Sequence, residues 1–268
     1  MKLFKLSLLT LSIGLLAACG SGGGSGDSSV PAGNNSSVNG NPTTDVSVKT
    51  DTKSIDLVAE QYKEQVKEAK RIQLADGTEL ELIDYPVGVV QKDVADGKVK
   101  GINLPYSVVG AWLPNNVKVD KEGVVIDPRV DQEDFDIFGL STTKDQIPVS
   151  GVAQYNGYSL GAIASGKLQL NVDFGNKTVD GKLYERKFDN GQNLPDIILT
   201  KGVITQGAEN IKEKDVMAFG GVATYKGVNG IYSGAFMGPN AEEVVGAVGS
   251  EEHGIYEAFA GQRGDIKQ

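Results

Sequence analysis

The chain has 268 residues, a formal net charge of −9 and a single cysteine. A chain of this length can bury a core large enough to fold without a disulfide bond. The acidic balance argues against nucleic acid as a partner and against general adsorption to an anionic membrane surface.

The first 18 residues have the pattern of an export signal. An apolar run over residues 6–16 follows a basic start, and this run is too short to form a stable bilayer-spanning helix. Leu16-Ala17-Ala18-Cys19 resembles a bacterial lipobox, which implies cleavage before Cys19 and lipidation of its thiol. Gly20 rather than aspartate follows, which in lipoproteins implies the outer membrane. We predict a lipoprotein signal peptide over residues 1–18 and a lipid on Cys19; the alternative is an ordinary signal peptide that ends in cysteine.

Residues 19–50 consist mainly of Gly, Ser, Asn, Thr and Pro. Such a stretch cannot bury enough apolar surface to offset the entropy lost on ordering. We predict a flexible, lipid-anchored tether with a root-mean-square reach of roughly 30 Å, which lifts the folded part of the chain off the bilayer.

The segment 55–72 is predicted to form an amphipathic helix, with Ser54 as its cap. Its apolar residues recur every three or four positions and share one face: Val58, Tyr62, Val66, Ala69 and Ile72. The other face carries opposite charges three residues apart: Glu60 with Lys63, Glu64 with Lys67, and Glu68 with Arg71. We expect the apolar face to pack on its own domain; binding a partner is the alternative.

Short strands separated by turns follow the predicted helix. The turn signals are Asp76-Gly77, Asp96-Gly97, Pro105 and Glu122-Gly123. Leu80 and Leu82 alternate with glutamates, and apolar runs cover residues 99–104 and 106–112. We therefore predict a handle-like α+β domain over residues 51–138, with one helix and a small antiparallel sheet.

Three aromatic residues of this domain stand next to or near a proline: Tyr85, Tyr106 and Trp112. Interfaces favour large aromatic anchors, and a backbone fixed by proline lowers the entropy lost on binding. We therefore hypothesise that Tyr85, Tyr106 and Trp112 contact a ligand, with Trp112 as the main anchor. The alternative is that these side chains pack against the helix.

From residue 139 onward the sequence is rich in glycine and has strand patterns throughout. Gly151-Val152-Ala153-Gln154-Tyr155-Asn156-Gly157 recurs as Gly221-Val222-Ala223-Thr224-Tyr225-Lys226-Gly227, which predicts a sheet of two similar halves. Leu168, Leu170, Val172 and Phe174 alternate with polar residues, so we expect them to point inward. Strands are expected at residues 150–158, 167–174, 178–187, 196–205, 216–226, 230–237, 241–249 and 254–262. Together they predict a mainly β protein whose residues 139–268 form a closed, eight-stranded antiparallel barrel filled by side chains.

Motifs for catalysis and metal binding are incomplete. Gly157-Tyr158-Ser159-Leu160-Gly161 matches the nucleophile elbow of serine hydrolases, but that motif requires a helix where a strand is expected here. Ser159 is therefore interpreted as a barrel-turn residue. The one histidine, His253, and one cysteine are too few for a zinc cluster, and the acidic residues of 127–136 lack the spacing of a calcium loop. We predict no catalytic residue, no metal site and no resident cofactor.

Several glycine-anchored phrases occur in an order typical of a known family. In the first half these include Gly151-Val152-Ala153-Gln154-Tyr155 and Gly166-Lys167-Leu168, and in the second half Gly234-Ala235-Phe236-Met237-Gly238-Pro239 and Ala258-Phe259-Ala260-Gly261-Gln262-Arg263. They resemble the C-terminal barrel of factor H binding protein, heparin-binding antigen and transferrin-binding protein B. The resemblance implies a surface lipoprotein of a Gram-negative bacterium that binds a host protein or haem, has no enzymatic chemistry and is exported by a dedicated outer-membrane translocator.

Two functions remain open at this point. The first is a monomeric outer-membrane lipoprotein, facing the cell exterior and held only by its lipid, that binds a complement regulator, a metalloprotein, haem or a tissue receptor. The second is a periplasm-facing structural lipoprotein with no host ligand. Protease treatment of intact cells separates them, because only a surface protein is removed.

Overall fold

The structure, a computed structural model, describes residues 52–73, 79–94, 97–118, 126, 136–207, 215–250 and 255–268. The predicted signal peptide, Cys19 and the tether lie outside these residues, as do His253 and the Glu122-Gly123 turn. Within the described ranges, no helix is both long and apolar enough to cross a membrane.

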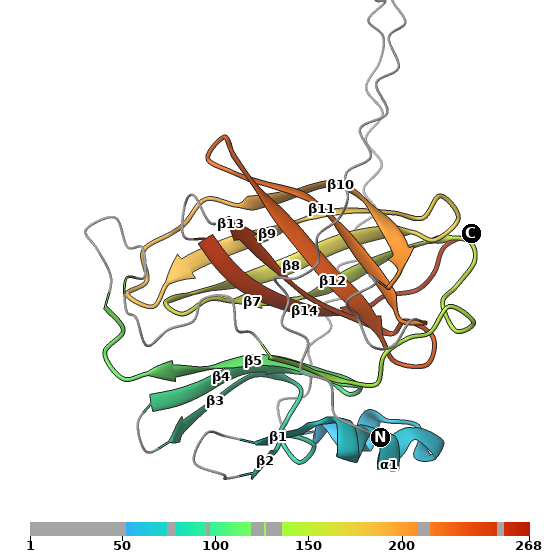
Figure 1. Ribbon diagram of the computed structural model, residues 1–268, viewed down its shortest axis with the longest axis horizontal. Coiled ribbons are helices and arrows are strands. Elements are labelled where there is room, and N and C mark those ends of the chain that lie inside the picture. The colour runs from blue at the N-terminus through green and yellow to red at the C-terminus, as the bar shows by residue number, and fades with distance from the viewer. Residues whose placement is uncertain are drawn as a thin grey trace, which may run out of the picture.

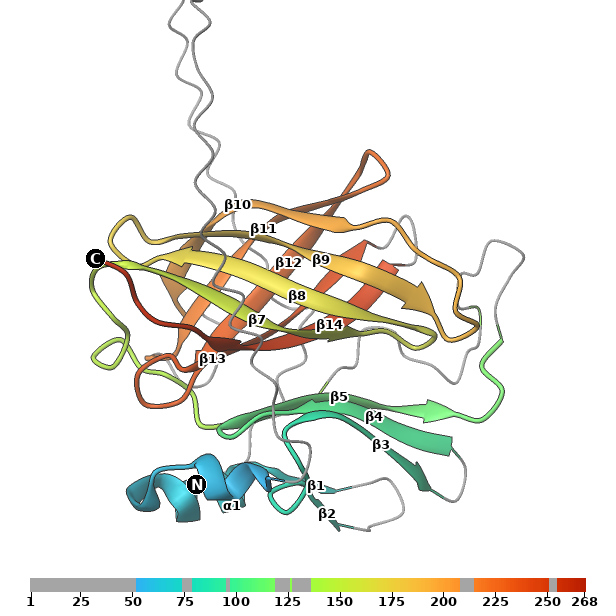
Figure 2. The same ribbon diagram turned by 180° about the vertical axis from the view of Figure 1, so that it is seen from behind.

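The chain is mainly β and forms three layers (Figures 1 and 2). The first layer consists of η2 (Ser54–Leu57), η3 (Glu60–Tyr62), α1 (Lys63–Ala69), β1 (Arg71–Gln73) and β2 (Glu79–Glu81). The second layer, here named the handle sheet, consists of β3 (Gly88–Val94), β4 (Gly97–Asn103), β5 (Ser107–Pro114) and β6 (Asp136–Gly139). The third layer is the barrel, with β7 (Val152–Leu160), β8 (Ala164–Asp173), β9 (Thr178–Phe188), β10 (Ile197–Gln206), β11 (Met217–Tyr225), β12 (Val228–Met237), β13 (Glu243–Ser250) and β14 (Ile255–Arg263).

The prediction of one continuous helix over residues 55–72 is wrong. Two 3-10 turns, η2 and η3, precede α1, and the backbone between them is extended at Val58 (ψ 132°) and Ala59 (ψ 138°). A β-branched valine loses side-chain freedom in a helix, which weakens a helix at this point. Val58 and Val66 are nevertheless both buried, so the apolar face packs inward as predicted. Ser54 makes no helix-capping bond; its hydroxyl donates to the carbonyl of Ile83 instead.

Two of the three predicted charge pairs are confirmed. Lys63 and Lys67 each lie 2.7 Å from a glutamate three residues earlier, Glu60 and Glu64. The side chain of Arg71 lies outside the described part of the structure, so its pairing stays a prediction.

The barrel closes as an up-and-down meander, as predicted. Its strands follow the order β10-β11-β12-β13-β14-β7-β8-β9, and β9 pairs with β10 to complete the ring. The first copy of the repeated phrase lies on β7 and the second on β11, four places apart in this ring of eight. The two copies therefore lie on opposite sides of the barrel, which agrees with a sheet of two similar halves.

Side chains fill the barrel interior. Leu168, Leu170, Val172 and Phe174 point into it, as predicted, and belong to one buried cluster with Phe236. The rings of Phe174 and Phe236 lie 6.0 Å apart between centroids. A filled interior directs ligand binding to the outer surfaces and loops.

The handle sheet is antiparallel, with the strand order β3-β4-β5-β6. The pairing of β3 with β4 runs from Gly88 opposite Asn103 to Val94 opposite Gly97, so Gly97 lies in β4. Asp96 of the predicted Asp96-Gly97 turn and the whole predicted Asp76-Gly77 turn lie outside the described residues. Pro105 lies in the turn between β4 and β5, where the Leu104 N–H donates to the Ser107 carbonyl at 2.8 Å. Strand β6 was not predicted. Nearly all of β4 is buried, because the first layer covers one face of the sheet and the barrel covers the other.

Candidate functional site

The handle sheet and the barrel share one apolar core, here named the seam. Its N-terminal residues are Val87, Ile102, Leu104, Val109 and Ile137, and its barrel residues are Leu160, Val216, Ala235, Met237, Val245, Ala258 and Ala260. Because both parts bury apolar side chains here, neither surface is available to a ligand. The binding surfaces to consider are the loops of the first layer and the uncovered parts of the barrel.

Two buried ionisable groups lie at the seam, one from each side. Glu243, the first residue of β13, accepts hydrogen bonds from the Tyr106 N–H (2.9 Å) and the Ser107 hydroxyl (2.7 Å). Lys70, which directly follows α1, donates to the Ser54 hydroxyl (2.9 Å) and the Leu104 carbonyl (2.6 Å). Burial raises the pKa of the Glu243 carboxyl to about 7 and lowers the pKa of the Lys70 ammonium to about 7.

A second polar contact crosses the seam near its edge. The Lys100 ammonium on β4 lies 3.0 Å from the carboxylate of Asp189, which follows β9. Lys100 is nearly buried, whereas Asp189 is exposed. Together with Glu243, this pair fixes the register in which the handle sheet lies on the barrel.

Tyr106 lies inside the protein, with only 8% of its surface exposed. It packs in one cluster with Val58 and Val66, and its ring meets that of Tyr62 edge-on at 6.5 Å. This is the arrangement that packing against the helix requires. Tyr106 therefore supports the joint between the first layer and the barrel, and its surface is not available to a ligand in this structure.

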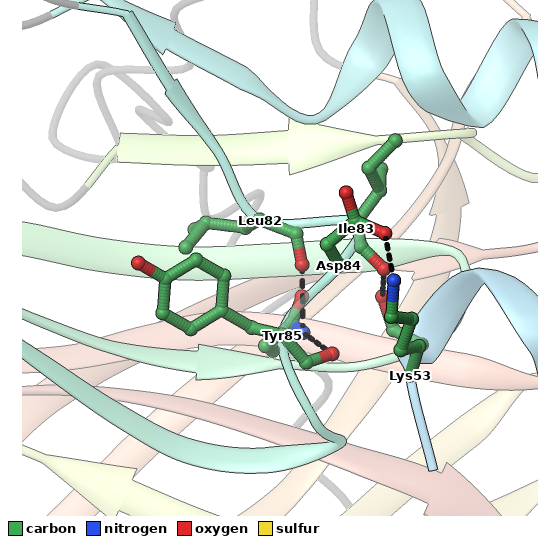
Figure 3. A network of polar contacts seen from close by, with 7 residues as sticks. Lys53, Leu82, Ile83, Asp84 and Tyr85 are labelled. Atoms are coloured by element: carbon green, nitrogen blue, oxygen red, sulfur yellow. Dashed lines mark hydrogen bonds and ion pairs between the residues drawn. The ribbon is translucent and has the colours of Figure 1, made fainter.

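Tyr85 lies on the loop that connects β2 to β3, and several contacts hold this loop in place (Figure 3). Lys53 forms an ion pair with Asp84 at 2.8 Å on one side of the loop. The backbone N–H groups of Ser54 and Ile55 donate to the carbonyls of Tyr85 and Ile83 at 3.0 and 3.2 Å. These contacts favour the conformation of the loop seen here, and a loop held in its binding conformation loses less entropy when a ligand binds.

Asn103 supports the same loop from beneath. Its side-chain amide nitrogen, which is buried, lies 3.0, 3.1 and 3.0 Å from the carbonyl oxygens of Leu82, Tyr85 and Pro86. The Tyr85 ring is half-buried against a cluster that includes Leu82 (Figure 3). Tyr85 thus combines a rigid backbone with a partly exposed aromatic face, as expected of an anchor residue.

Trp112 lies on β5, where its backbone pairs with Val99. Its side chain lies outside the described part of the structure, so its role as the main anchor stays a prediction. Tyr85 and Tyr106 belong to separate buried clusters, and the structure does not bring them together into one site.

The interpretation of Ser159 as a turn residue is wrong. Ser159 lies within β7, is fully buried, and donates a 3.0 Å hydrogen bond to Glu257. Glu257 also forms a buried ion pair with Arg186, whose guanidinium lies 5.0 Å from the centre of the Tyr225 ring. Since β8 follows β7, the helix that a nucleophile elbow needs is replaced by a strand. This polar cluster lies inside one end of the barrel.

In the part of the chain that the structure describes, no three His, Cys, Asp or Glu residues gather as metal ligands.

Residues 145–248 match the family described as "Factor H binding protein, C-terminal". The chain also resembles a solved structure of the vaccine antigen transferrin-binding protein B from Haemophilus parasuis, with a TM-score of 0.50 and 19% identity over 74% of this chain and 41% of that one. The barrel has the factor H binding protein and transferrin-binding protein B fold. The matched part is less than half of the Haemophilus protein. No curated protein sequence matches the chain.

Two further structures resemble this factor H binding protein-like chain more weakly. Transferrin-binding protein B of serogroup B Neisseria meningitidis has a TM-score of 0.49 and 18% identity over 74% of this chain and 40% of that one. HpuA from Kingella denitrificans, solved in complex with human haemoglobin, has a TM-score of 0.46 and 15% identity over 74% of this chain and 77% of that one.

The residues that organise the candidate site were not singled out in the sequence. Asn103 ends an otherwise apolar strand pattern. A polar residue at this position is the one feature of the sequence that could have indicated its structural role. Lys70 is adjacent in sequence to the charged residues that were predicted to form the solvent-exposed face of the helix. Glu243 alternates with the inward-pointing Val244, so the pattern places it on the outside of the barrel, and only the handle sheet buries it.

Proposed function

We propose that this protein is an outer-membrane lipoprotein that faces the cell exterior and binds a host protein. The observation that carries the proposal is the match of residues 145–248 to the C-terminal family of factor H binding protein. The fold shared with transferrin-binding protein B supports the same class of function. The lipobox-like sequence that ends at Cys19 supports a lipid anchor as the means of attachment.

The ligand binds on outer surfaces in this proposal, because side chains fill the barrel interior. In the first layer, the Tyr85 loop is the contact region that the geometry favours. Ion pairing at Asp84 and the three contacts from Asn103 hold the loop rigid, while the Tyr85 ring stays partly exposed. Binding then requires little reorganisation of the protein.

Protease treatment of intact bacteria tests the location. We expect loss of the protein from intact cells, and loss of palmitate-analogue labelling in the Cys19→Ser variant. If the protein resists protease until the outer membrane is permeabilised, it is instead a periplasm-facing structural lipoprotein.

Binding assays with immobilised wild-type protein test the ligand class. The probes are whole host serum, purified complement factor H and purified transferrin, with serum albumin as the control. Retention of a serum protein other than albumin is the expected result. Failure to retain any serum protein, or a haem absorption band in the purified chain with no protein bound, contradicts a host-protein ligand.

A further inference from the structure

Strand β3 forms an open edge of the handle sheet (Figure 1). Among the strands that the structure describes, β3 pairs only with β4. Val89 on β3 exposes 51% of its surface, although it lies opposite Ile102, which is buried in the seam. The apolar face of the handle sheet therefore continues onto β3 and ends there uncovered. Natural proteins usually protect such an edge, because its unpaired N–H and C=O groups can bond to another strand.

The start of the first layer lies next to β3. Lys53 forms an antiparallel β-bridge with Pro86, two residues before β3 begins, and the Ser54 N–H donates to the Tyr85 carbonyl at 3.0 Å. In an antiparallel pair, residues that precede Lys53 lie beside residues that follow Pro86. A chain that continued this pairing would run along the open edge of β3 towards Val94.

The residues just before Lys53 have the composition of a strand. No glycine occurs between Gly40 and Gly77, and five of the eight residues 43–50 are β-branched: Thr43, Thr44, Val46, Val48 and Thr50. β-branched residues favour strands and are uncommon in flexible tethers. Val46 and Val48 alternate with polar residues, which is typical of a strand with one covered face.

The bridge also sets the register of such a strand. Continued without a shift, the pairing of Lys53 with Pro86 places Thr50 opposite Val89 and Val48 opposite Gln91. Val48 is then a diagonal neighbour of Val89 on the same face of the sheet, where its side chain is within reach. The chain bends at Gly88, which has a φ of 125°, so the register beyond this bend needs a direct test.

We propose that residues 45–51 add to β3 as a fifth, antiparallel strand of the handle sheet, with Val46 and Val48 on the face that Val89 leaves uncovered. This strand shortens the predicted tether and moves its start to the Val94 end of β3. Without it, the tether would start at Lys53, beside the Tyr85 loop. The two ends of a seven-residue strand are roughly 20 Å apart. The added strand therefore keeps the chain that leads to the membrane away from the Tyr85 loop; this consequence rests on the proposed function, whereas the strand itself does not.

Hydrogen exchange of the full-length protein in detergent tests the strand without any ligand. Mass spectrometry reads the peptides that contain residues 45–51 and 88–94. We expect residues 45–51 of the wild type to exchange at least about tenfold more slowly than an unstructured peptide of the same sequence. Val48→Pro removes an N–H that points at β3 in this register, so residues 45–51 should lose their protection and residues 88–94 should exchange faster. Ser47→Pro is the matched control and should keep the protection, because the Ser47 N–H points away from β3.

Several outcomes would overturn the added strand. One is exchange of residues 45–51 in the wild type at the rate of the unstructured peptide, and another is equal protection in the wild type and Val48→Pro. Protection that is kept in Val48→Pro but lost in Ser47→Pro would show a register shifted by one residue, which turns both valines to the other face. A second copy on this edge would give protection of residues 88–94 that falls on dilution, with residues 45–51 unprotected. None of these results involves a serum protein, so failure of the strand leaves the proposed function standing, and failure to retain a serum protein leaves the strand standing.

Discussion

The Ser107 hydroxyl donates a 2.7 Å hydrogen bond to the carboxylate of Glu243, and this bond ties the handle sheet to the barrel. The two residues are 136 positions apart in the chain. Glu243 accepts a second bond from the Tyr106 backbone, and the cationic Lys70 is close enough to attract it through space. The buried carboxylate thus depends on groups from the first layer and from the handle sheet at once.

The stability losses from replacing Lys70 and Glu243 should not be additive, because the two buried groups interact. Lys70→Met leaves the Leu104 carbonyl without its donor and Glu243 without its cation, and we expect a loss of about 3–5 kcal/mol in the free energy of unfolding. The double variant Lys70→Met/Glu243→Gln should lose at least about 1 kcal/mol less than the sum of the single losses. Chemical denaturation at pH 7 measures all four proteins. Strict additivity would show that the two groups act independently.

The same pair should make stability depend on pH. Folded Glu243 keeps its proton to about pH 7, above its ordinary pKa of 4.5, so its contribution to stability falls as the pH rises from 4.5 to 7. Folded Lys70 is deprotonated at about pH 7 rather than 10.5, so its contribution rises from pH 7 to 10.5. Relative to the double variant, the wild type should be least stable near pH 7 and recover at both pH 5 and pH 9. If the difference in the free energy of unfolding between the wild type and the double variant is the same at every pH, the two groups do not have these shifted pKa values.

Ser159→Ala tests the polar cluster inside the barrel. The hydroxyl is buried and donates to Glu257, so its removal should lower the free energy of unfolding by about 1–3 kcal/mol. Ser165→Ala on β8 is the matched control, because Ser165 is exposed, and it should change stability by less than about 0.5 kcal/mol. Equal effects of the two substitutions in chemical denaturation would mean that the bond to Glu257 contributes nothing.

The barrel could be predicted because its signals are local. Alternation with a period of two, as at Leu168, Leu170 and Val172, fixes which face points inward, and glycine-bounded turns fix the strand lengths. The repeated phrase also predicted that the barrel consists of two similar halves. The prediction of one continuous helix failed for a local reason too. Apolar spacing alone does not reveal the extended backbone at Val58 and Ala59.

The seam could not be predicted, because it depends on contacts between distant residues. Glu243 meets the backbone of Tyr106 across 137 positions, and nothing near either residue in the sequence indicates the other. The burial of Tyr106 follows from the same contact. Asn103 binds three carbonyls of a loop about 20 residues earlier, and only the folded sheet brings that loop within reach.

The last prediction concerns Tyr85 as a ligand anchor. Its ring is partly exposed on a loop that Asn103 and the ion pair between Lys53 and Asp84 hold rigid, so Tyr85→Ala should remove contact area without releasing the loop. We expect binding of the serum protein that the wild type retains to weaken by at least about 2 kcal/mol if Tyr85 is an anchor. Tyr158→Ala is the matched control, because Tyr158 is also exposed but lies on the barrel. It should leave the affinity within about 0.5 kcal/mol of wild type.

Asn103→Leu distinguishes the contribution of the Tyr85 ring to binding from that of the loop backbone. This substitution leaves Tyr85 in place but removes the donor to the Leu82, Tyr85 and Pro86 carbonyls. We expect faster amide hydrogen exchange in residues 82–87 and weaker binding, because the loop must then be ordered by the ligand. The affinities are compared by biolayer interferometry, with thermal unfolding to confirm that each variant is folded. If Tyr85→Ala binds as tightly as wild type while Asn103→Leu does not, the backbone of the loop and not the Tyr85 ring makes the contact. If both bind as wild type does, the ligand contacts another surface, and the Tyr85 loop is only part of the packing beneath the handle sheet.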